Sequence, residues 1–319
     1  MDKLLEQIGS LGILPVAIVD DEKKAVILAR TLSECGLPAI EVTFRTQAAA
    51  SVIEQIAKDS QQMLVGAGTV LTIDQARTAI DAGARFIVSP GFNPKVIEFC
   101  LSNSIPIIPG IATPTEIQYA IEYNLEVVKF FPAEASGGTE YLKAIAAPFK
   151  EMQFIPTGGI EESTLLSYLR LPQVLACGGS WMIPSAYINS GSFDEIMKLT
   201  RKAIATMLGF ELRHIGINMP NINEAKQIAT TIEKYFGFGV NETNGSFFVG
   251  TQFEVLKQQY LGAKGHIAIA THFVKRAVAH LALKGINIKP ETKNVQDGKL
   301  STVYLDLEIG GFAIHLVQV

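Results

Sequence analysis

A lysine that could perform covalent chemistry lies inside an apolar stretch of the chain. Lys129 occupies the segment LEVVKFFPAE (125–134), whose β-branched and aromatic residues are typical of a buried strand. Burial favours the neutral amine over the charged ammonium group, and a neutral amine can attack a ketone to form a Schiff base. The alternative is a lysine whose stem lies along the strand while its charged head reaches water. This segment alone leaves both interpretations open.

Two further ionisable side chains lie in and just after an apolar run near residue 40. Glu41 belongs to AIEVTF (39–44), where burial would favour the protonated carboxyl and suit it to proton transfer. For such a glutamate, a charge held by a neighbouring lysine or arginine is the commoner role. Arg45 carries a planar guanidinium group that fits a substrate carboxylate, although an arginine after a strand is more often solvated. Residues 1–213 contain no histidine, so proton transfer there falls to carboxylates, amines or hydroxyls.

The elements that must position these residues recur at regular intervals. Short apolar runs alternate with segments of helical periodicity, at a spacing of a little over twenty residues. This alternation predicts a parallel sheet covered by helices, and eight units predict an α/β fold of the (β/α)8 TIM barrel type, with a doubly wound open sheet as the alternative. In a barrel, the functional residues lie at the C-terminal ends of the strands. The eight runs are residues 13–20, 39–44, 63–69, 86–91, 105–112, 126–132, 153–159 and 173–180.

Glycine pairs follow the seventh and the eighth run. Gly158-Gly159 and Gly178-Gly179 would allow backbone N–H groups to approach an anion. Each pair is weak evidence by itself, because tight turns between a strand and a helix also need glycine. The loops after strands seven and eight commonly form the phosphate site of a barrel, so the two pairs together predict such a site.

Seven collinear motifs between about residues 5 and 208 resemble the 2-keto-3-deoxy-6-phosphogluconate (KDPG) and 4-hydroxy-2-oxoglutarate (KHG) aldolase family. They are EVTFRT (41–46), GAGTV (66–70), SPG (89–91), PGI (109–111), VKFFPAE (128–134), PTGGI (156–160) and GGSW (178–181). The resemblance implies a class I aldolase that cleaves KDPG, and in some members KHG, releasing pyruvate in the Entner–Doudoroff part of carbohydrate metabolism. It implies no cofactor, no metal for the aldolase reaction, and a homo-oligomer, with a trimer favoured.

The resemblance also implies roles for individual residues. Lys129 would form the Schiff base, and Glu41 would be the acid and base. Substrate binding would fall to Arg45 and Thr69 for the pyruvate carboxylate, to Pro90, Phe131 and Thr157 for the pocket, and to Gly158, Gly159, Gly179 and Ser180 for the distal phosphate.

Composition restricts the partners and the location. The 319 residues carry a net charge of −4 and no run of five like charges, so neither nucleic acid nor an anionic membrane surface is an expected partner. No apolar stretch approaches the roughly 18 residues of a membrane span, and the first residues lack the apolar core of a signal peptide. The three cysteines lack paired spacing, which suits a reducing compartment. We therefore expect a cytoplasmic enzyme that acts on a small molecule.

The composition changes near residue 210, and an internal repeat begins there. All five histidines lie beyond this point, and RHIGINM (213–219) matches GHIAIAT (265–271). A helix-like segment, a glycine turn and strand-like segments follow each copy. This pattern predicts a smaller α+β domain of two βαβββ modules, and hence domains at 1–209 and 210–319.

This C-terminal region resembles the glyoxalase, or vicinal-oxygen-chelate, superfamily over about residues 211–319. The resemblance implies a divalent metal held by the first and the last strand of each module, and imidazole and carboxylate ligands would suit Zn²⁺, Ni²⁺, Mn²⁺ or Fe²⁺. The positions are His214, Glu254, His266 and His315, of which His315 departs from the more usual glutamate. Three alternatives stay open: a metal-dependent second reaction, a binding or regulatory module, and a polar cleft without metal.

Overall fold

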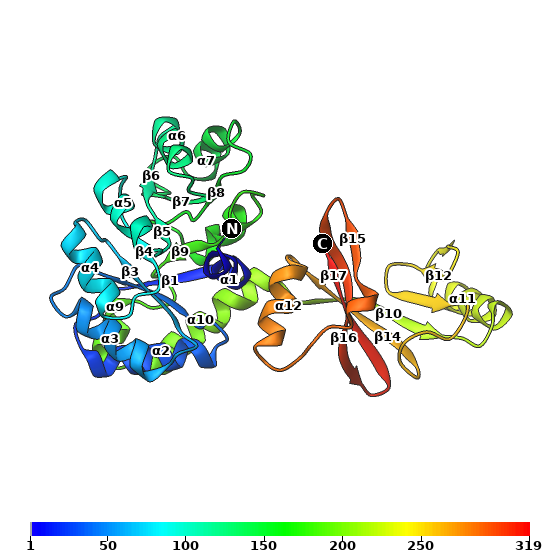
Figure 1. The fold of residues 1–319 in the computed structure, drawn as a ribbon. Helices are drawn as coiled ribbons and strands as arrows, with labels where there is room; N and C mark the ends of the chain where they lie inside the picture. Colours follow the sequence, from blue (N-terminus) through cyan, green and yellow to red (C-terminus); the bar gives the residue numbers. More distant parts are fainter. Residues whose placement is uncertain (1) are drawn as a thin grey trace. The chain divides into compact units, whose positions relative to one another are not determined.

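The computed structural model describes residues 2–319 and divides the chain into two compact units, with the boundary between Met207 and Leu208 (Figure 1). The first unit alternates strands and helices. Its strands are β1 (Ile13–Ala17), β2 (Ala39–Thr43), β3 (Leu64–Gly68), β4 (Ile87–Val88), β5 (Ile107–Ile108), β6 (Gly110–Ile111), β7 (Val127–Phe130), β8 (Gln153–Phe154) and β9 (Cys177–Gly179). Its helices are α1 (Lys3–Leu11), α2 (Glu22–Glu34), α3 (Ala49–Asp59), α4 (Ile73–Asp81), α5 (Pro94–Ser102), α6 (Pro114–Glu122), α7 (Gly138–Ala146), α8 (Glu162–Leu169), α9 (Ser185–Ser190) and α10 (Phe193–Leu208).

The strands of the first unit pair in parallel and in a closed order. One sheet has the order β5-β4-β3-β2-β1-β9, and a second has the order β6-β7-β8. The segments around β8 and β9 are joined by the bridges Phe154↔Val174 and Thr157↔Gly178. Strands β5 and β6 belong to one apolar run, divided at Pro109, which has no N–H group to donate. The order of pairing therefore returns to its start, as in a TIM-barrel-like fold.

Local sequence explains where the helices begin. At α6 the Thr113 hydroxyl accepts a hydrogen bond from the Glu116 N–H, and the Glu116 carboxylate accepts from the Thr113 N–H at 2.9 Å. Pro114 occupies the first helical turn, where no N–H is required. Ile117 and Ala120 then form the buried face of the helix. Such faces cover a barrel core in which the largest fully buried side chains are Tyr168, Phe86, Phe130 and Phe154.

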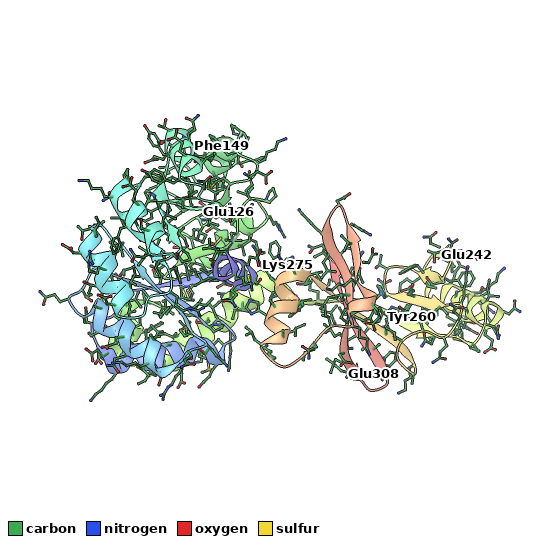
Figure 2. All side chains as sticks on the ribbon, in the orientation of Figure 1. Glu126, Phe149, Glu242, Tyr260, Lys275 and Glu308 are labelled. Carbon is green, nitrogen blue, oxygen red and sulfur yellow. The ribbon has the colours of Figure 1, made fainter. Side chains whose placement is uncertain are left out.

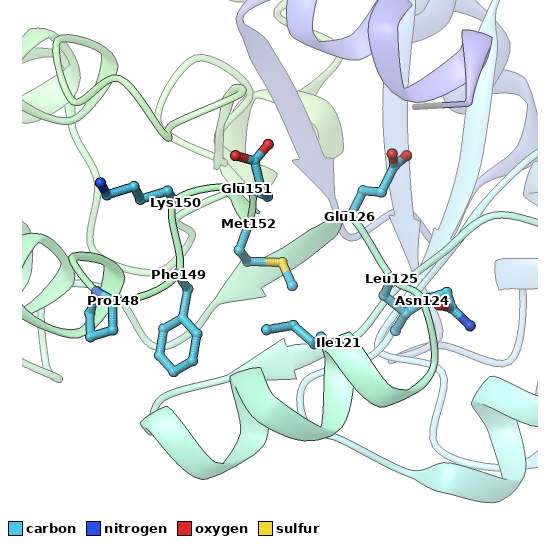
Figure 3. A pocket seen from close by; sticks show the side chains of 9 residues that line it. All are labelled: Ile121, Asn124, Leu125, Glu126, Pro148, Phe149, Lys150, Glu151 and Met152. Atoms are coloured by element: carbon cyan, nitrogen blue, oxygen red, sulfur yellow. The ribbon is translucent and has the colours of Figure 1, made fainter.

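A hollow of about 590 Å³ lies at one end of the first unit (Figure 3). It is formed by the loops that lead into β7 and β8, so it lies at the N-terminal ends of these strands. Active sites of barrels lie at the opposite end. The lining residues are Ile121, Asn124, Leu125, Glu126, Pro148, Phe149, Lys150, Glu151 and Met152.

The second unit contains one mixed sheet and two copies of the same order of elements. The first copy is β10 (Glu211–Asn218), α11 (Ile222–Phe236), β11 (Val240–Glu242), β12 (Ser246–Val249) and β13 (Phe253–Leu256). The second copy is β14 (Gly265–Thr271), α12 (Val274–Ala282), the 3-10 turn η1 (Pro290–Thr292), β15 (Asn294–Gln296), β16 (Lys299–Ile309) and β17 (Phe312–Gln318). The sheet order is β11-β12-β13-β10-β14-β17-β16-β15.

The two copies meet in the centre of this sheet. The first strands, β10 and β14, are antiparallel neighbours, and each runs parallel to the last strand of its own copy. Helix α11 packs Ala225 and Ala229 against a core that includes Phe247, Val249 and Val255. Charged side chains such as those of Glu242, Lys275 and Glu308 project into solvent (Figure 2). Within residues 2–319, none of the helices combines the length and apolar character that a bilayer crossing demands.

Candidate active site and metal cluster

Lys129 and Glu41 form an ion pair inside the barrel. Their side chains come from β7 and β2, and the Nζ atom lies 3.2 Å from Oε1. Only 7% of the Lys129 side chain and 1% of the Glu41 side chain is exposed, so both side chains are buried. The two strands are not hydrogen-bonded neighbours, so the pair spans the barrel interior. The ring of Phe131 lies beside the amine, with its centroid 5.3 Å from Nζ.

This geometry suits a proton exchange that prepares a nucleophile. Transfer of a proton from the Lys129 ammonium to the Glu41 carboxylate leaves a neutral amine and a neutral acid. Because the two groups are in direct contact, this transfer needs no intervening water. The amine can then attack a carbonyl carbon, while the acid stays within reach to return the proton.

The absence of a side chain at Gly68 leaves space for the Glu41 carboxylate. Gly68 was not predicted as a site residue from the sequence. It is the last residue of β3, next to β2 in the sheet. A Cβ atom there would lie 2.1 Å from Oε1 of Glu41 and 2.7 Å from its Cδ. The signal in the sequence was LVGAG (64–68), since two glycines in a strand weaken it and often mark a close approach.

We expect Gly68→Ala to lower kcat about 10²-fold, because an added methyl group displaces the Glu41 carboxylate from Lys129 by roughly an ångström. The measurement is steady-state turnover, with the melting temperature to check folding. Gly239→Ala is the matched control, since a Cβ there meets nothing within 4 Å. Wild-type kcat in a folded Gly68→Ala protein would contradict this role of Gly68.

The other predicted site residues of the barrel also follow strands at this end. Arg45 is exposed after β2, and Thr69 and Pro90 are half-buried after β3 and β4. Thr157 is buried, and its Oγ1 atom would lie 2.3 Å from a Cβ at Gly178. Ser180 is exposed, and Gly179 would meet the Trp181 ring if it carried a side chain.

Gly158 and Gly159 form the loop between β8 and α8. Their φ angles are +99° and +80°, a conformation that favours glycine. A Cβ at Gly158 would lie 3.3 Å from the Phe131 ring. The loop therefore keeps its backbone uncovered by side chains of its own, as close contact with an anion requires.

In the second unit, three histidines and a glutamate converge. His214 Nε2 lies 3.1 Å from His266 Nε2, and the Oε2 atom of Glu254 lies 3.3 Å from the first and 3.2 Å from the second. A ring nitrogen of His315 lies within 4.8 Å of those of the other two histidines. The four residues stand on β10, β13, β14 and β17, the first and last strands of both copies.

Electrostatics leaves two members of this cluster, His315 and Glu254, with free electron pairs. Burial, followed by the neighbouring His266 and His214, lowers the pKa of His315 to about 3, so its ring is neutral near pH 7. Burial raises the pKa of Glu254, but hydrogen bonds from His214, His266 and Ser246 outweigh this effect and hold the pKa well below its usual range. The carboxylate is therefore charged.

Comparisons with known proteins agree with the first unit. The KDPG and KHG aldolase family model matches residues 5–199. The 2-dehydro-3-deoxy-phosphogluconate aldolase of Treponema pallidum (strain Nichols) is 47% identical over 204 residues, which cover 64% of this chain and 97% of that protein. The KHG/KDPG aldolase of Escherichia coli (strain K12) is 42% identical over 192 residues, 60% of this chain and 90% of that protein.

A solved structure is similar in both fold and sequence. The KDPG aldolase of Legionella pneumophila, with pyruvate captured as a covalent carbinolamine intermediate, has a TM-score of 0.61 and 34% identity. The match covers 63% of this chain and 98% of that one. The prediction of a TIM-barrel-like fold is confirmed by this likeness.

The barrel, the buried lysine and these relatives define a class I aldolase, a lyase that works through a Schiff base. The chain belongs to the KDPG and KHG aldolase family. The predictions of this family and of aldolase activity are thus confirmed. The matched residues end at 199, so the second unit lies outside the family model, and its resemblance to the glyoxalase superfamily stays a prediction.

Proposed function

We propose that the barrel cleaves KDPG to pyruvate and glyceraldehyde 3-phosphate, and KHG to pyruvate and glyoxylate. The observation that carries this proposal is the buried Lys129–Glu41 pair, with 3.2 Å between Nζ and Oε1, on the strand ends where a barrel active site lies. The small-molecule complex of the Legionella relative supports pyruvate as the common product. KDPG and its galactonate epimer differ in one hydroxyl configuration, and we propose KDPG as the main substrate.

The proposed reaction begins with Lys129. Its neutral amine adds to the C2 ketone, and the resulting carbinolamine loses water to give a cationic imine. When a base removes the C4 hydroxyl proton, the C3–C4 bond breaks, its electrons form an enamine with the imine, and the aldehyde leaves. Glu41 carries protons in these steps and returns one to C3. Hydrolysis of the imine then releases pyruvate and restores the amine.

Substrate binding in this proposal follows the rim of the barrel. Arg45 and Thr69 hold the pyruvate carboxylate, and Pro90, Phe131 and Thr157 shape the pocket. The distal phosphate lies against the backbone N–H groups of the two glycine loops. Its partners are Gly158, Gly159, Gly179 and Ser180.

The test is pyruvate release by the purified protein from each of the two substrates. We expect turnover of both, with a lower KM for KDPG because only KDPG carries the phosphate. Absence of pyruvate from either substrate, with folded protein, would contradict the proposal. We further propose a cytoplasmic homotrimer that needs no cofactor for this reaction, and a domain division at 1–209 and 210–319.

We also propose that the second unit binds one divalent metal ion through His214, Glu254, His266 and His315. The Nε2 atoms of His214 and His266 lie 3.1 Å apart, and both face the same oxygen of Glu254. If each Nε2 donates its proton to that oxygen, no proton is left for a hydrogen bond between the two nitrogens. Both ring nitrogens of His315 and Nδ1 of His266 are buried without a hydrogen-bond partner. Ligands of a tetrahedral ion with bonds of about 2.0–2.1 Å stand about 3.3 Å apart, close to the observed spacings.

The metal proposal predicts binding of one Zn²⁺ per chain after treatment with EDTA, measured by calorimetry. We expect His266→Ala to weaken this binding at least about 100-fold, because a ligand is lost from a four-ligand site. His272→Gln, a histidine outside the cluster, should bind as the wild type does. Aldolase turnover should be the same with and without EDTA. A wild-type protein that binds no Zn²⁺, Ni²⁺, Mn²⁺ or Fe²⁺ would contradict the proposal.

A further inference from the structure

A hydrogen bond outside the reacting centre joins the loop after β7 to helix α8, close to Gly159. The Tyr168 hydroxyl donates to Oε1 of Glu134 at 2.5 Å. Tyr168 lies on α8 and is fully buried, whereas Glu134 lies in the loop after β7. Helix α8 directly follows the glycine loop, so this bond fixes the helix behind the loop to the neighbouring loop.

The stem of Glu134 lies flat against Gly159. A Cβ atom on this glycine would lie 2.7 Å from the Cβ of Glu134 and 2.9 Å from its Cγ. Two backbone hydrogen bonds hold the loops in register, from the Ala133 N–H to the Thr157 carbonyl at 2.8 Å and from the Glu134 N–H to the Gly158 carbonyl at 3.0 Å. The side chain of Glu134 therefore packs against Gly159, and its carboxylate is fixed by the hydrogen bond from Tyr168.

Both atoms of this hydrogen bond also lie close to the start of α7. A Cβ at Gly138, the first residue of that helix, would lie 3.6 Å from the Tyr168 hydroxyl and 3.7 Å from Oε1 of Glu134. Oε1 of Glu134 therefore lies beside the first residue of α7 and accepts the hydrogen bond from the phenol. Burial, aided by the hydrogen bond to Glu134, raises the pKa of Tyr168, so the phenol remains a donor at physiological pH.

We propose that Glu134 and Tyr168 are positioning residues that set the enzyme's preference for phosphorylated substrates, by holding the Gly158–Gly159 backbone in the conformation that receives the phosphate. This inference rests on the proposed function, in which that loop is the phosphate site. Neither side chain touches the reacting atoms. Their loss acts on binding of the phosphate end, and leaves imine formation at Lys129 intact.

The experiment compares Tyr168→Phe, Glu134→Ala and Glu134→Gln with the wild type, on KDPG and on KHG. We expect Tyr168→Phe and Glu134→Ala to raise KM for KDPG about tenfold, as the loss of a charge-assisted hydrogen bond would, with kcat within about twofold. KM for KHG, which lacks the phosphate, should not change. Inhibition by inorganic phosphate should weaken by the same factor. Glu134→Gln keeps an acceptor for the phenol and should not raise KM.

Tyr123→Phe is the matched control, because it removes a hydrogen bond of the same kind, from a phenol to Glu98 at 2.8 Å, away from the glycine loops. If the variants change KM equally for both substrates, or change it for neither, the inference is wrong. The proposed function would still stand, provided that the wild type cleaves KDPG. If Tyr168→Phe fails to fold, the comparison of Glu134→Ala with Glu134→Gln tests the inference. If inorganic phosphate does not inhibit the wild type, the proposed phosphate site is wrong, and the inference that rests on it is wrong as well.

Discussion

Lys129→Ala should lower kcat/KM for KDPG by more than about 10⁴-fold, because it removes the nucleophile on which every covalent step depends. The substitution also leaves Glu41 without its buried partner. That carboxyl group can take up a proton and avoid an isolated buried charge, so the barrel should still fold. The measurement is the initial rate of pyruvate release over a series of KDPG concentrations, which gives kcat/KM, with circular dichroism and the melting temperature as the check on folding.

Lys129→Arg separates the nucleophile from the charge. A guanidinium keeps a cation opposite Glu41 but is not deprotonated in proteins, so it cannot attack a ketone. We expect this variant to be as inactive as Lys129→Ala. Lys58→Ala, which removes an exposed lysine paired with Glu54, should keep full activity. Substantial turnover in either Lys129 variant would sink the Schiff-base mechanism at this position.

Glu41→Gln should lower kcat by about 10²–10⁴-fold, the range that general acid–base catalysis supplies. Glutamine has the shape of glutamate and can still accept a hydrogen bond from the amine, but it cannot carry a proton. The nucleophile Lys129 is still present, so imine formation with pyruvate should continue, at a reduced rate because the proton carrier is lost. The measurement is kcat together with the fraction of protein trapped by borohydride.

The control for this variant is Glu98→Gln, whose side chain accepts a hydrogen bond from Tyr123. It should turn over at the wild-type rate. If Glu41→Gln is unimpaired, the proton carrier must be another group of the barrel. If it forms no trapped adduct at all, Glu41 would be needed already for carbinolamine formation.

Much of the barrel could be predicted from the alternation of strand-like and helix-like segments. Each of the eight predicted runs contains a strand, and residues 105–112 supply two, since Pro109 interrupts the ladder. The apolar runs around Lys129 and Glu41 also indicated that both residues belong to strands, as β7 and β2 show. The sequence could not show that the two side chains meet, because 88 residues separate them and the contact depends on how the barrel closes.

Contacts that depend on packing were harder to predict. The need for glycine at residue 68 follows from the direction of the Glu41 side chain, which is a property of the folded barrel. The hydrogen bond between Glu134 and Tyr168 joins a loop to a later helix. Nothing in the sequence around either residue indicates the other as its partner. In the second unit, the repeat already related His214 to His266, because β10 and β14 are equivalent strands that lie side by side.

The central claim is that Lys129 is the Schiff-base nucleophile, and reduction with borohydride in the presence of pyruvate tests it most directly. Peptide mass mapping then locates the adduct among the lysines. We predict a reduced pyruvyl adduct on Lys129 and none on the exposed lysines. A folded wild-type protein without an adduct, or with the adduct on a different lysine, would contradict the claim.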